Sequence, residues 1–258
     1  MKNTTLKSKL RNREVTIGSW ITIGHQAIID IMAESNFDWL TIDMEHTSID
    51  LNELQILIGF IQSHNIAALV RVSKNEEVCI KRALDAGADG IIIPMICSKD
   101  DALQAVSFSK YPPMGKRGVG LNRAQRYGFG FDEYYKWVNE QLVVIAQIEH
   151  IDGVDNIADI LQVEDIDAVF IGPYDLSGSI GATGNFNDEK FISAITKVEN
   201  ECKLKEKSLG YHVVEPNGRL VLDKIKSGYN FVAFSTDFLF MGTKAKEEMK
   251  KSISVELI

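Results

Sequence analysis

The chain has 258 residues, of which 45% are hydrophobic, and its formal net charge at pH 7 is −8. A chain of this length can bury one substantial core, so we expect a single domain over residues 1–258, and the negative charge argues against a nucleic-acid partner. No apolar run approaches the roughly 20 residues needed to span a bilayer, which argues against a membrane partner.

The N-terminal stretch 1–13 and the cysteines indicate the compartment. The stretch is basic but lacks the apolar block of a signal peptide. The three cysteines, Cys79, Cys97 and Cys202, lie far apart without the spacing of a metal site, and a sparse, odd number suggests a reducing compartment. We therefore expect a cytoplasmic protein.

Strand-like and helix-like patterns alternate along the chain without a linker or low-complexity segment. Short apolar runs predict strands at residues 15–21, 37–44, 66–72, 90–95, 142–146, 166–171, 209–214 and 229–234. Helical patterns separate them at residues 27–34, 50–61, 75–87, 132–140, 153–161, 187–202 and 216–226, with further helices opening at Ser98 and Asp237. Eight repeats of strand then helix predict an α/β fold, the (β/α)8 TIM barrel. The main competitor is a doubly wound open sheet, but no glycine-rich dinucleotide-binding fingerprint follows the first strand.

Capping residues mark where several of these helices begin and end. Asp50 followed by Glu53 resembles a capping box. Ser98, with an aspartate in the first turn behind it, is a second expected N-cap. We expect Asn75 to cap the helix that Gly87 closes.

The segment 111–130 interrupts the alternation. It holds five glycines and the four cations Lys116, Arg117, Arg123 and Arg126. A loop of this length inside a compact domain is usually functional. Its cations either select a polar or anionic substrate group, or they are solvated or contact another subunit.

Polar and charged residues follow the apolar part of several predicted strands. They are Asp43, Glu45 and His46 after the second strand, Arg71 at the end of the third, Gln147 and Glu149 at the end of the fifth, and Asp175 after the turn Gly172–Pro173. Such groups are costly in apolar surroundings unless they are paired or bind a ligand. Because the chemistry of a (β/α)8 barrel lies at the carboxyl ends of its strands, we expect these side chains to share one mouth. Each could alone be structural, and Glu149 and Asp175 could instead complement helix dipoles.

The residue types at this mouth suggest metal-assisted chemistry on a 2-oxo acid. Two carboxylates, Glu149 and Asp175, suit a divalent metal ion such as Mg²⁺ or Mn²⁺, with Co²⁺ as a further option, and leave positions for two adjacent substrate oxygens. Arg71 would face an oxyanion that develops on the substrate. His46 can take a proton near neutral pH, with Asp43 orienting it or titrating with it. No predicted strand contains the lysine that a Schiff-base aldolase needs.

Five sequence motifs, in order and over nearly the whole chain, resemble the HpcH/HpaI family of class II pyruvate aldolases. They are Asp43-Met44-Glu45-His46, Val70-Arg71-Val72, Tyr111 to Gly118, Gln147-Ile148-Glu149 and Ile171 to Ser177. The resemblance implies a barrel of the phosphoenolpyruvate/pyruvate type and a metal-dependent enzyme similar to 4-hydroxy-2-oxoheptanedioate aldolase. Such an enzyme reversibly cleaves a 4-hydroxy-2-oxo acid to pyruvate and an aldehyde through a metal-stabilised pyruvate enolate.

The resemblance also implies a role for each site residue. Glu149 and Asp175 would hold the metal, Arg71 would contact the pyruvate oxygen, His46 with Asp43 would form the base system, Gln147 would support the site, and backbone at Gly172 and Tyr174 would receive the carboxylate. Trp20 and His212 are expected to complete the substrate-binding residues. Family members are commonly hexamers with an exchanged C-terminal helix, so the resemblance implies a homo-oligomer.

Three departures from the family pattern bear on specificity. Tyr174 stands where the family often has alanine, and His212 stands where a small apolar residue is usual. We expect His212, together with the cations of 111–130, to select a polar or anionic aldehyde. His150 follows Glu149, and strand alternation points it away from the site, so we expect it to be a core or helix-cap residue. His25, at the first strand-helix turn, could also reach the rim.

Two other functions remain open at this stage. One is a lyase for acyl-CoA thioesters similar to the citrate-lyase β subunit, which the Asp43-Met44-Glu45-His46 cluster argues against. The other is a barrel that has lost turnover and binds a 2-oxo acid.

Overall fold

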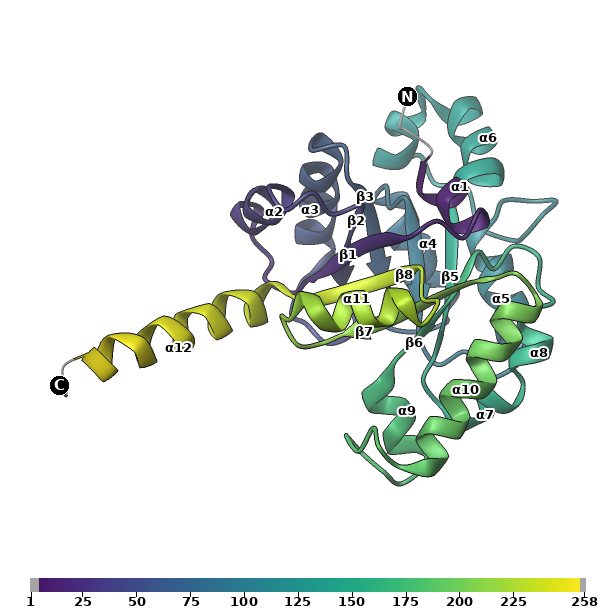
Figure 1. Ribbon diagram of the computed structural model, residues 1–258. Coiled ribbons are helices and arrows are strands. Elements are labelled where there is room, and N and C mark those ends of the chain that lie inside the picture. The colour runs from purple at the N-terminus through teal and green to yellow at the C-terminus, as the bar shows by residue number, and fades with distance from the viewer. Residues whose placement is uncertain (1–4, 256–258) are drawn as a thin grey trace.

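The eight predicted strand-helix repeats form one closed barrel (Figure 1). The computed structural model describes residues 5–255, so the first four residues of the basic N-terminal stretch and the last three of the predicted domain lie outside the described residues. All strands pair in parallel and in chain order: β1 (Thr16–Ile21), β2 (Trp39–Asp43), β3 (Ala67–Arg71), β4 (Gly90–Ile93), β5 (Val143–Ile148), β6 (Ala168–Ile171), β7 (Ser208–Val213) and β8 (Phe231–Thr236). The (β/α)8 prediction is confirmed.

Helices lie between successive strands and at both ends of the described chain. They are α1 (Thr5–Arg11), α2 (Gln26–Ala33), α3 (Leu51–Ser63), α4 (Glu77–Asp85), α5 (Lys99–Ser109), η1 (Arg123–Gly128), α6 (Phe131–Gln141), α7 (Ile151–Asp155), α8 (Ile157–Ile160), α9 (Pro173–Ser179), α10 (Glu189–Leu204), α11 (Gly218–Lys226) and α12 (Asp237–Val255).

Alternate residues of the strands fill the barrel interior. The ring of Trp39 stacks on Phe231 with 4.3 Å between ring centroids. Gly18 makes room for it, since a Cβ there would lie only 2.0 Å from the Trp39 ring. Two residues along β1, Trp20 meets Phe170 edge to face at 5.9 Å. Burying side chains of this size stabilises the fold by roughly 1.5–3 kcal/mol each.

Helix α1 closes the N-terminal end of the barrel. Its Leu6 and Leu10 join the interior apolar cluster. Between them Lys7 is buried, and its Nζ donates to Asp167 Oδ2 at 2.8 Å and to the Leu142 carbonyl at 2.7 Å. Both acceptors stand just before strands, β5 and β6, so the helix is fastened to the sheet at the end opposite the predicted site.

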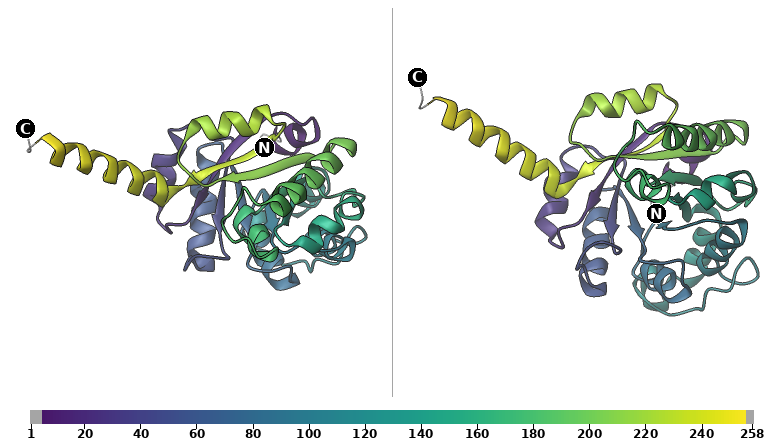
Figure 2. Two further views of the ribbon diagram at one scale, coloured as in Figure 1. Left: turned by 60° about the horizontal axis from the view of Figure 1, so that its bottom comes forward. Right: turned by 90° about the horizontal axis from the view of Figure 1, so that it is seen from below.

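Helix α12 extends away from the barrel in every view (Figures 1 and 2). At its first residue, the buried Asp237 carboxylate accepts from the backbone N–H groups of Thr22 and Ile23 at 2.8 and 2.9 Å, and from the Thr22 hydroxyl. These bonds fix the start of α12 to the turn after β1. No described helix is both long enough and apolar enough to cross a membrane.

Most predicted caps are confirmed, and one is wrong. Asp50 and Glu53 form a complete capping box, and Ser98 caps α5. Asn75 does not cap α4: its amide donates to the Asp101 carbonyl at 2.9 Å, and Glu76 occupies the N-cap without a side-chain bond.

Element boundaries differ from the prediction in two further places. The predicted helix 153–161 is two short helices, α7 and α8. The helix predicted to start at residue 187 is α10, which begins at Glu189 with Asp188 as its N-cap.

Candidate active site

Asp43 and Arg71 form the fixed pair of the mouth. They end the neighbouring strands β2 and β3 and stand opposite each other in the register. Arg71 donates twice, from Nε to Oδ1 at 3.0 Å and from Nη2 to Oδ2 at 2.7 Å. Burial alone would raise the pKa of Asp43, but the bonds and charge of Arg71 outweigh it and hold that pKa below its usual value. Oδ1 also accepts from the backbone N–H groups of Glu45 and His46, so this carboxylate shapes the loop behind it.

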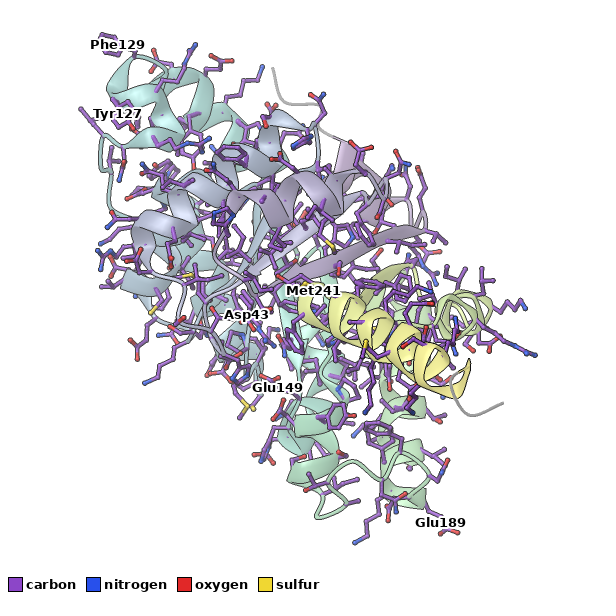
Figure 3. All side chains as sticks on the ribbon, turned by 90° about the vertical axis from the view of Figure 1, so that its left-hand side faces the viewer. Asp43, Tyr127, Phe129, Glu149, Glu189 and Met241 are labelled. Carbon is purple, nitrogen blue, oxygen red and sulfur yellow. The ribbon has the colours of Figure 1, made fainter. Side chains whose placement is uncertain are left out.

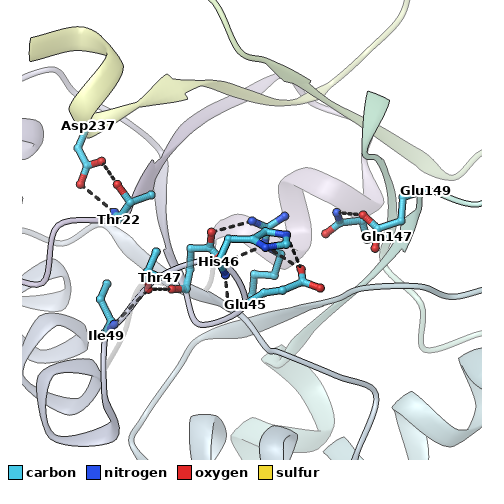
Figure 4. A network of polar contacts seen from close by, with 10 residues as sticks. Thr22, Glu45, His46, Thr47, Ile49, Gln147, Glu149 and Asp237 are labelled. Atoms are coloured by element: carbon cyan, nitrogen blue, oxygen red, sulfur yellow. Dashed lines mark hydrogen bonds and ion pairs between the residues drawn. The ribbon is translucent and has the colours of Figure 1, made fainter. Parts of the chain in front are cut away.

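Glu45 and His46 lie together beside that pair (Figure 4). Glu45 Oε2 is 3.6 Å from His46 Nε2 and 3.4 Å from Arg71 Nε. The Glu45 side chain is 18% exposed, whereas the His46 ring is 61% exposed. Burial raises the pKa of Glu45, and neighbouring Asp43 adds to the increase while Arg71 opposes it. The imidazole at this mouth therefore has Glu45 as its carboxylate neighbour.

Glu149 and Gln147 face this group from the end of β5 (Figure 4). The Gln147 amide donates to Glu149 Oε2, and the Met95 backbone N–H donates to Oε1 at 2.8 Å. Gly172 packs against both, since a Cβ there would lie 2.9 Å from Glu149 Oε2 and 3.1 Å from the Gln147 amide nitrogen. A glycine at this position of the turn after β6 therefore leaves room for the Glu149 carboxylate.

The charge around Glu149 is unbalanced. The residue is 4% exposed, and burial raises its pKa to about 7, with Glu45 and Asp175 contributing to the increase. The Met95 N–H and Arg71 lower it but do not compensate. An ionised carboxylate so placed is unfavourable unless a further positive charge is present.

Asp175 comes to this mouth from α9. Pro173 occupies the first turn of the helix, and Gly172 precedes it as the N-cap. Asp175 is exposed at the rim and close enough to influence both Glu149 and Glu45 electrostatically. Next to it, Tyr174 is half exposed, and its ring packs on Phe186 at 5.1 Å.

The donor set fits a hard divalent cation. Glu149 and Asp175 supply carboxylate oxygens, and the raised pKa of Glu149 reports excess negative charge at the same place. Among residues 5–255, no group of three or more His, Cys, Asp or Glu side chains is arranged to hold a metal ion. A cation between these two carboxylates would therefore keep open positions for substrate and water.

Trp20 and His212 line the side of the mouth next to Arg71. The Arg71 guanidinium carbon lies 4.3 Å above the Trp20 ring, and the His212 ring lies 5.6 Å from the same indole. Burial, with Arg71 adding to it, lowers the pKa of His212 to about 4, so this imidazole is neutral near pH 7. His212 Nε2, Trp20 Nε1 and Gln147 Oε1 are buried and have no hydrogen-bond partner within the described part of the chain. Each of these three side chains therefore keeps an unsatisfied hydrogen-bonding atom next to the mouth.

The cations of 111–130 have partners on the outer side of the barrel, in the loop itself or on neighbouring helices. Arg117 bonds Asp85 at 2.5 Å, Arg123 bonds the Ala86 carbonyl and Gln62, Arg126 bonds Glu133, and Lys116 lies over the Phe108 ring. Figure 3 shows Tyr127 and Phe129 of this loop far from Asp43 and Glu149. These contacts argue against the aldehyde-selecting role, and Arg117 is buried rather than solvated.

Two of the predicted histidines are helix caps. His150 Nδ1 accepts from the Asp152 N–H at the start of α7, which confirms the cap interpretation. His25 does the same for α2, accepting from the Ala27 N–H at 3.2 Å.

Sequence reasoning missed the Met95 backbone N–H at this mouth. The Met95 N–H reaches Glu149 because Met95 adopts a positive φ of 53°, which the sequence does not signal. It also gave no role to Glu45, although the spacing Asp43-Met44-Glu45-His46 contained the signal.

The sequence and the fold of this chain are similar to those of known proteins. The profile of the HpcH/HpaI aldolase/citrate lyase family matches residues 16–239. The chain is 34% identical to 2-dehydro-3,6-dideoxy-6-sulfogluconate aldolase of Pseudomonas putida, over 92% of each chain. It is 35% identical to 2-keto-3-deoxy-L-rhamnonate aldolase of Escherichia coli O6:K15:H31, over 90% of this chain and 86% of that one. A crystal structure of an HpcH/HpaI aldolase/citrate lyase family protein from Burkholderia cenocepacia J2315 superposes with a TM-score of 0.91 at 29% identity, covering 97% of this chain and 99% of the other.

Proposed function

Because the chain belongs to the HpcH/HpaI aldolase/citrate lyase family, we propose that it is an aldolase that reversibly cleaves a 4-hydroxy-2-oxo acid to pyruvate and an aldehyde. The substrates named for its two aldolase relatives are 2-keto-3-deoxy sugar acids, which carry the 2-oxo and 4-hydroxyl groups that this reaction requires. A sugar acid of that class is the substrate we propose here.

One observation carries the proposal most directly. Glu149 is buried beside other carboxylates with a pKa raised to about 7, while Arg71 stands across the mouth. This arrangement suits a site that receives a cation together with an anionic 2-oxo acid. We propose that Glu149 and Asp175 hold the cation, as Mg²⁺, Mn²⁺ or Co²⁺. When bound, such an ion supplies positive charge for the two adjacent oxygens of the 2-oxo acid.

Arg71 and His46 take the chemical roles in this proposal. Arg71 is oriented by Asp43 through two bonds, and its guanidinium faces the substrate oxyanion. His46 accepts the proton of the C4 hydroxyl as the C3–C4 bond breaks and its electron pair becomes the enolate of pyruvate. The same proton then passes from His46 to C3, which gives pyruvate and leaves the histidine neutral.

The remaining residues bind and orient the substrate. The backbone N–H of Tyr174, at the start of α9, would receive the carboxylate of pyruvate. The Gly172 N–H already donates to the Ile148 carbonyl at 3.2 Å, so the expected role of that group is not supported. Gln147 Oε1, which has no partner among the described residues, would accept a hydrogen bond from the substrate. The Trp20 ring packs against the Arg71 guanidinium. His212 offers a neutral hydrogen-bonding nitrogen, which suits a hydroxyl group on the aldehyde better than an anionic group.

Pyruvate release from a panel of 2-keto-3-deoxy sugar acids and oxaloacetate tests the proposal. Release that stops on chelation, returns with Mg²⁺ or Mn²⁺, and is lost in Glu149→Gln is the expected result. Release that survives thorough chelation would contradict the metal assignment. Silence across the panel would favour the acyl-CoA lyase, which CoA-thioester substrates would reveal, or the 2-oxo-acid-binding barrel, which would bind pyruvate without turnover.

A homo-oligomer and a cytoplasmic location complete the proposal. Helix α12 extends from the barrel with Phe238, Met241 and Met249 exposed, as Figure 3 shows for Met241, and such apolar surface favours association. Sedimentation at micromolar concentration would measure the subunit number.

A further inference from the structure

The carboxylate of Asp43 bonds Arg71 and the backbone rather than the His46 ring. Oδ2 accepts from Arg71 Nη2, and Oδ1 accepts from Arg71 Nε and from two backbone N–H groups. Within residues 5–255, no hydrogen bond or ion pair joins this carboxylate to the His46 imidazole. Its contact with His46 is through the backbone, so Asp43 fixes the loop and leaves the ring to another group.

Glu45 is in the opposite situation. Its Oε2 is buried and makes no hydrogen bond, yet it stands between two positive or protonatable groups, 3.4 Å from Arg71 Nε and 3.6 Å from His46 Nε2. A carboxylate next to Nε2 favours the tautomer with hydrogen on that nitrogen. Nδ1 is then the nitrogen that accepts a proton from the substrate.

The same carboxylate constrains Arg71. Asp43 and Glu45 together engage Nε and Nη2 of the guanidinium. Nη1 is the nitrogen without a carboxylate partner among the described residues, so it is the one left to face a substrate oxygen.

We propose that Glu45 is a positioning residue that orients both His46, which carries the proton, and Arg71, which faces the oxyanion. It holds the His46 ring with Nδ1 toward the substrate, compensates the positive charge when the ring carries the proton, and keeps Arg71 Nη1 aimed at the oxyanion. The inference rests on the proposed aldolase function. In each cleavage the proton leaves the C4 hydroxyl, resides on His46 and returns at C3, so Glu45 is neither consumed nor covalently changed.

Charged groups from every neighbouring element act on Glu45. Arg71 on β3 attracts its negative charge, while Asp43 after β2, Asp175 on α9 and Glu149 after β5 repel it. In the described part of the chain, Glu45 thus has three carboxylates and only one guanidinium around it. A protonated His46 ring would add a second positive charge, so Glu45 and the imidazolium stabilise each other. Asp43 contacts His46 through the His46 backbone N–H and makes no bond to the ring among the described residues.

Glu45→Gln tests the role with shape preserved and charge removed. We expect kcat for pyruvate release to fall about 10- to 100-fold, with KM changed by less than about twofold. The reason is that Glu45 contacts His46 and Arg71 rather than the substrate, so the variant loses no binding contact. Glu45→Asp should recover part of kcat. Glu77→Gln, which removes a glutamate paired with Lys81 on α4, is the matched control and should match the wild type.

Nitrogen NMR separates failure of this inference from failure of the aldolase proposal. Glu45→Gln should shift both the His46 ring signals and the Arg71 Nε–H signal, and leave the His25 ring signals in place, whether or not the protein turns over any substrate. His46 signals that stay unchanged would overturn the positioning role, and so would a wild-type kcat in Glu45→Gln. Shifted signals in a protein that releases no pyruvate would support the contact and contradict only the aldolase.

Discussion

At the N-terminal end of the barrel, Lys7 and Asp167 are buried as an ion pair with further hydrogen bonds to backbone, whereas at the mouth Glu149 is buried among carboxylates with one guanidinium nearby. At both ends, charged side chains are buried from solvent: Lys7 and Asp167 at one end and Glu149 at the other. At the closed end the charges of Lys7 and Asp167 neutralise each other. At the mouth, Glu149 has an excess of like charge, and Trp20, Gln147 and His212 have unpartnered atoms.

We therefore expect the Lys7–Asp167 pair to stabilise the fold, and the group around Glu149 to be stabilised only when a ligand is bound. Removing a charge should cost stability at the closed end and gain stability at the mouth. The predictions below test that contrast, from the largest expected effect to the smallest.

Lys7→Met should destabilise the protein by about 3–5 kcal/mol, because it leaves Asp167 buried without its cation. Urea unfolding measures this, and kcat per folded molecule should stay unchanged. Lys9→Met on the same helix is the matched control: its pair with Asp38 is about one-third exposed, so its loss should cost less than about 1 kcal/mol. Equal costs for the two variants would mean that burial does not distinguish them.

Glu149→Gln should abolish pyruvate release yet stabilise the metal-free protein at pH 8 by about 3 kcal/mol. The folded-state pKa, about 7, lies above the ordinary value of 4.5, so ionisation costs stability that grows from pH 4.5 to 7 and is then constant. At pH 5 the gain should shrink to less than about 1 kcal/mol. Unfolding in chelator at both pH values measures it, and a variant less stable than the wild type at pH 8 would refute an excess of negative charge.

His212 should make the wild type sensitive to mild acid. Its folded-state pKa of about 4 lies below the ordinary 6.5, so there is no cost above pH 6.5 and a growing cost as pH falls toward 4. At pH 5 the wild type should lose about 2 kcal/mol relative to His212→Gln, compared with their difference at pH 7.5. Parallel stability–pH curves for the two proteins would contradict a buried neutral imidazole.

His212→Leu should alter the choice of aldehyde. We expect the preference for a hydroxylated over an unsubstituted aldehyde, measured as a ratio of kcat/KM in addition to pyruvate, to fall about tenfold. The ratio should not change in a variant of the outer loop such as Arg126→Gln, because Arg126 pairs with Glu133 at the surface. An unchanged ratio in His212→Leu would remove this residue from the pocket.

The sequence predicted the elements that depend on local pattern. The eight strands and the Asp50–Glu53 capping box follow from periodicity and spacing within a few residues, and the structure has them. The convergence of Asp43, Arg71 and Glu149 at one mouth followed from the barrel topology alone.

Contacts between distant segments could not be predicted in this way. Asn75 is a good cap by residue type, but its amide nitrogen donates to the Asp101 carbonyl, 26 positions away, and its Oδ1 has no partner among the described residues. The partners of Arg117 and Arg123 lie on α3 and α4, which no local pattern of the loop specifies. Glu45 was visible in its motif, but its position between His46 and Arg71 depends on how the loop after β2 folds.

The stacking of Arg71 on Trp20 gives the protein an intrinsic optical probe. The guanidinium lies 4.3 Å from the indole, while Trp39 is fully buried deeper in the barrel. A ligand that draws Arg71 toward itself changes the electric field at the Trp20 ring and leaves that at Trp39 nearly constant. Subtracting the emission of Trp20→Phe from that of the wild type isolates this signal, so the filling of the mouth can be followed without a label and without turnover.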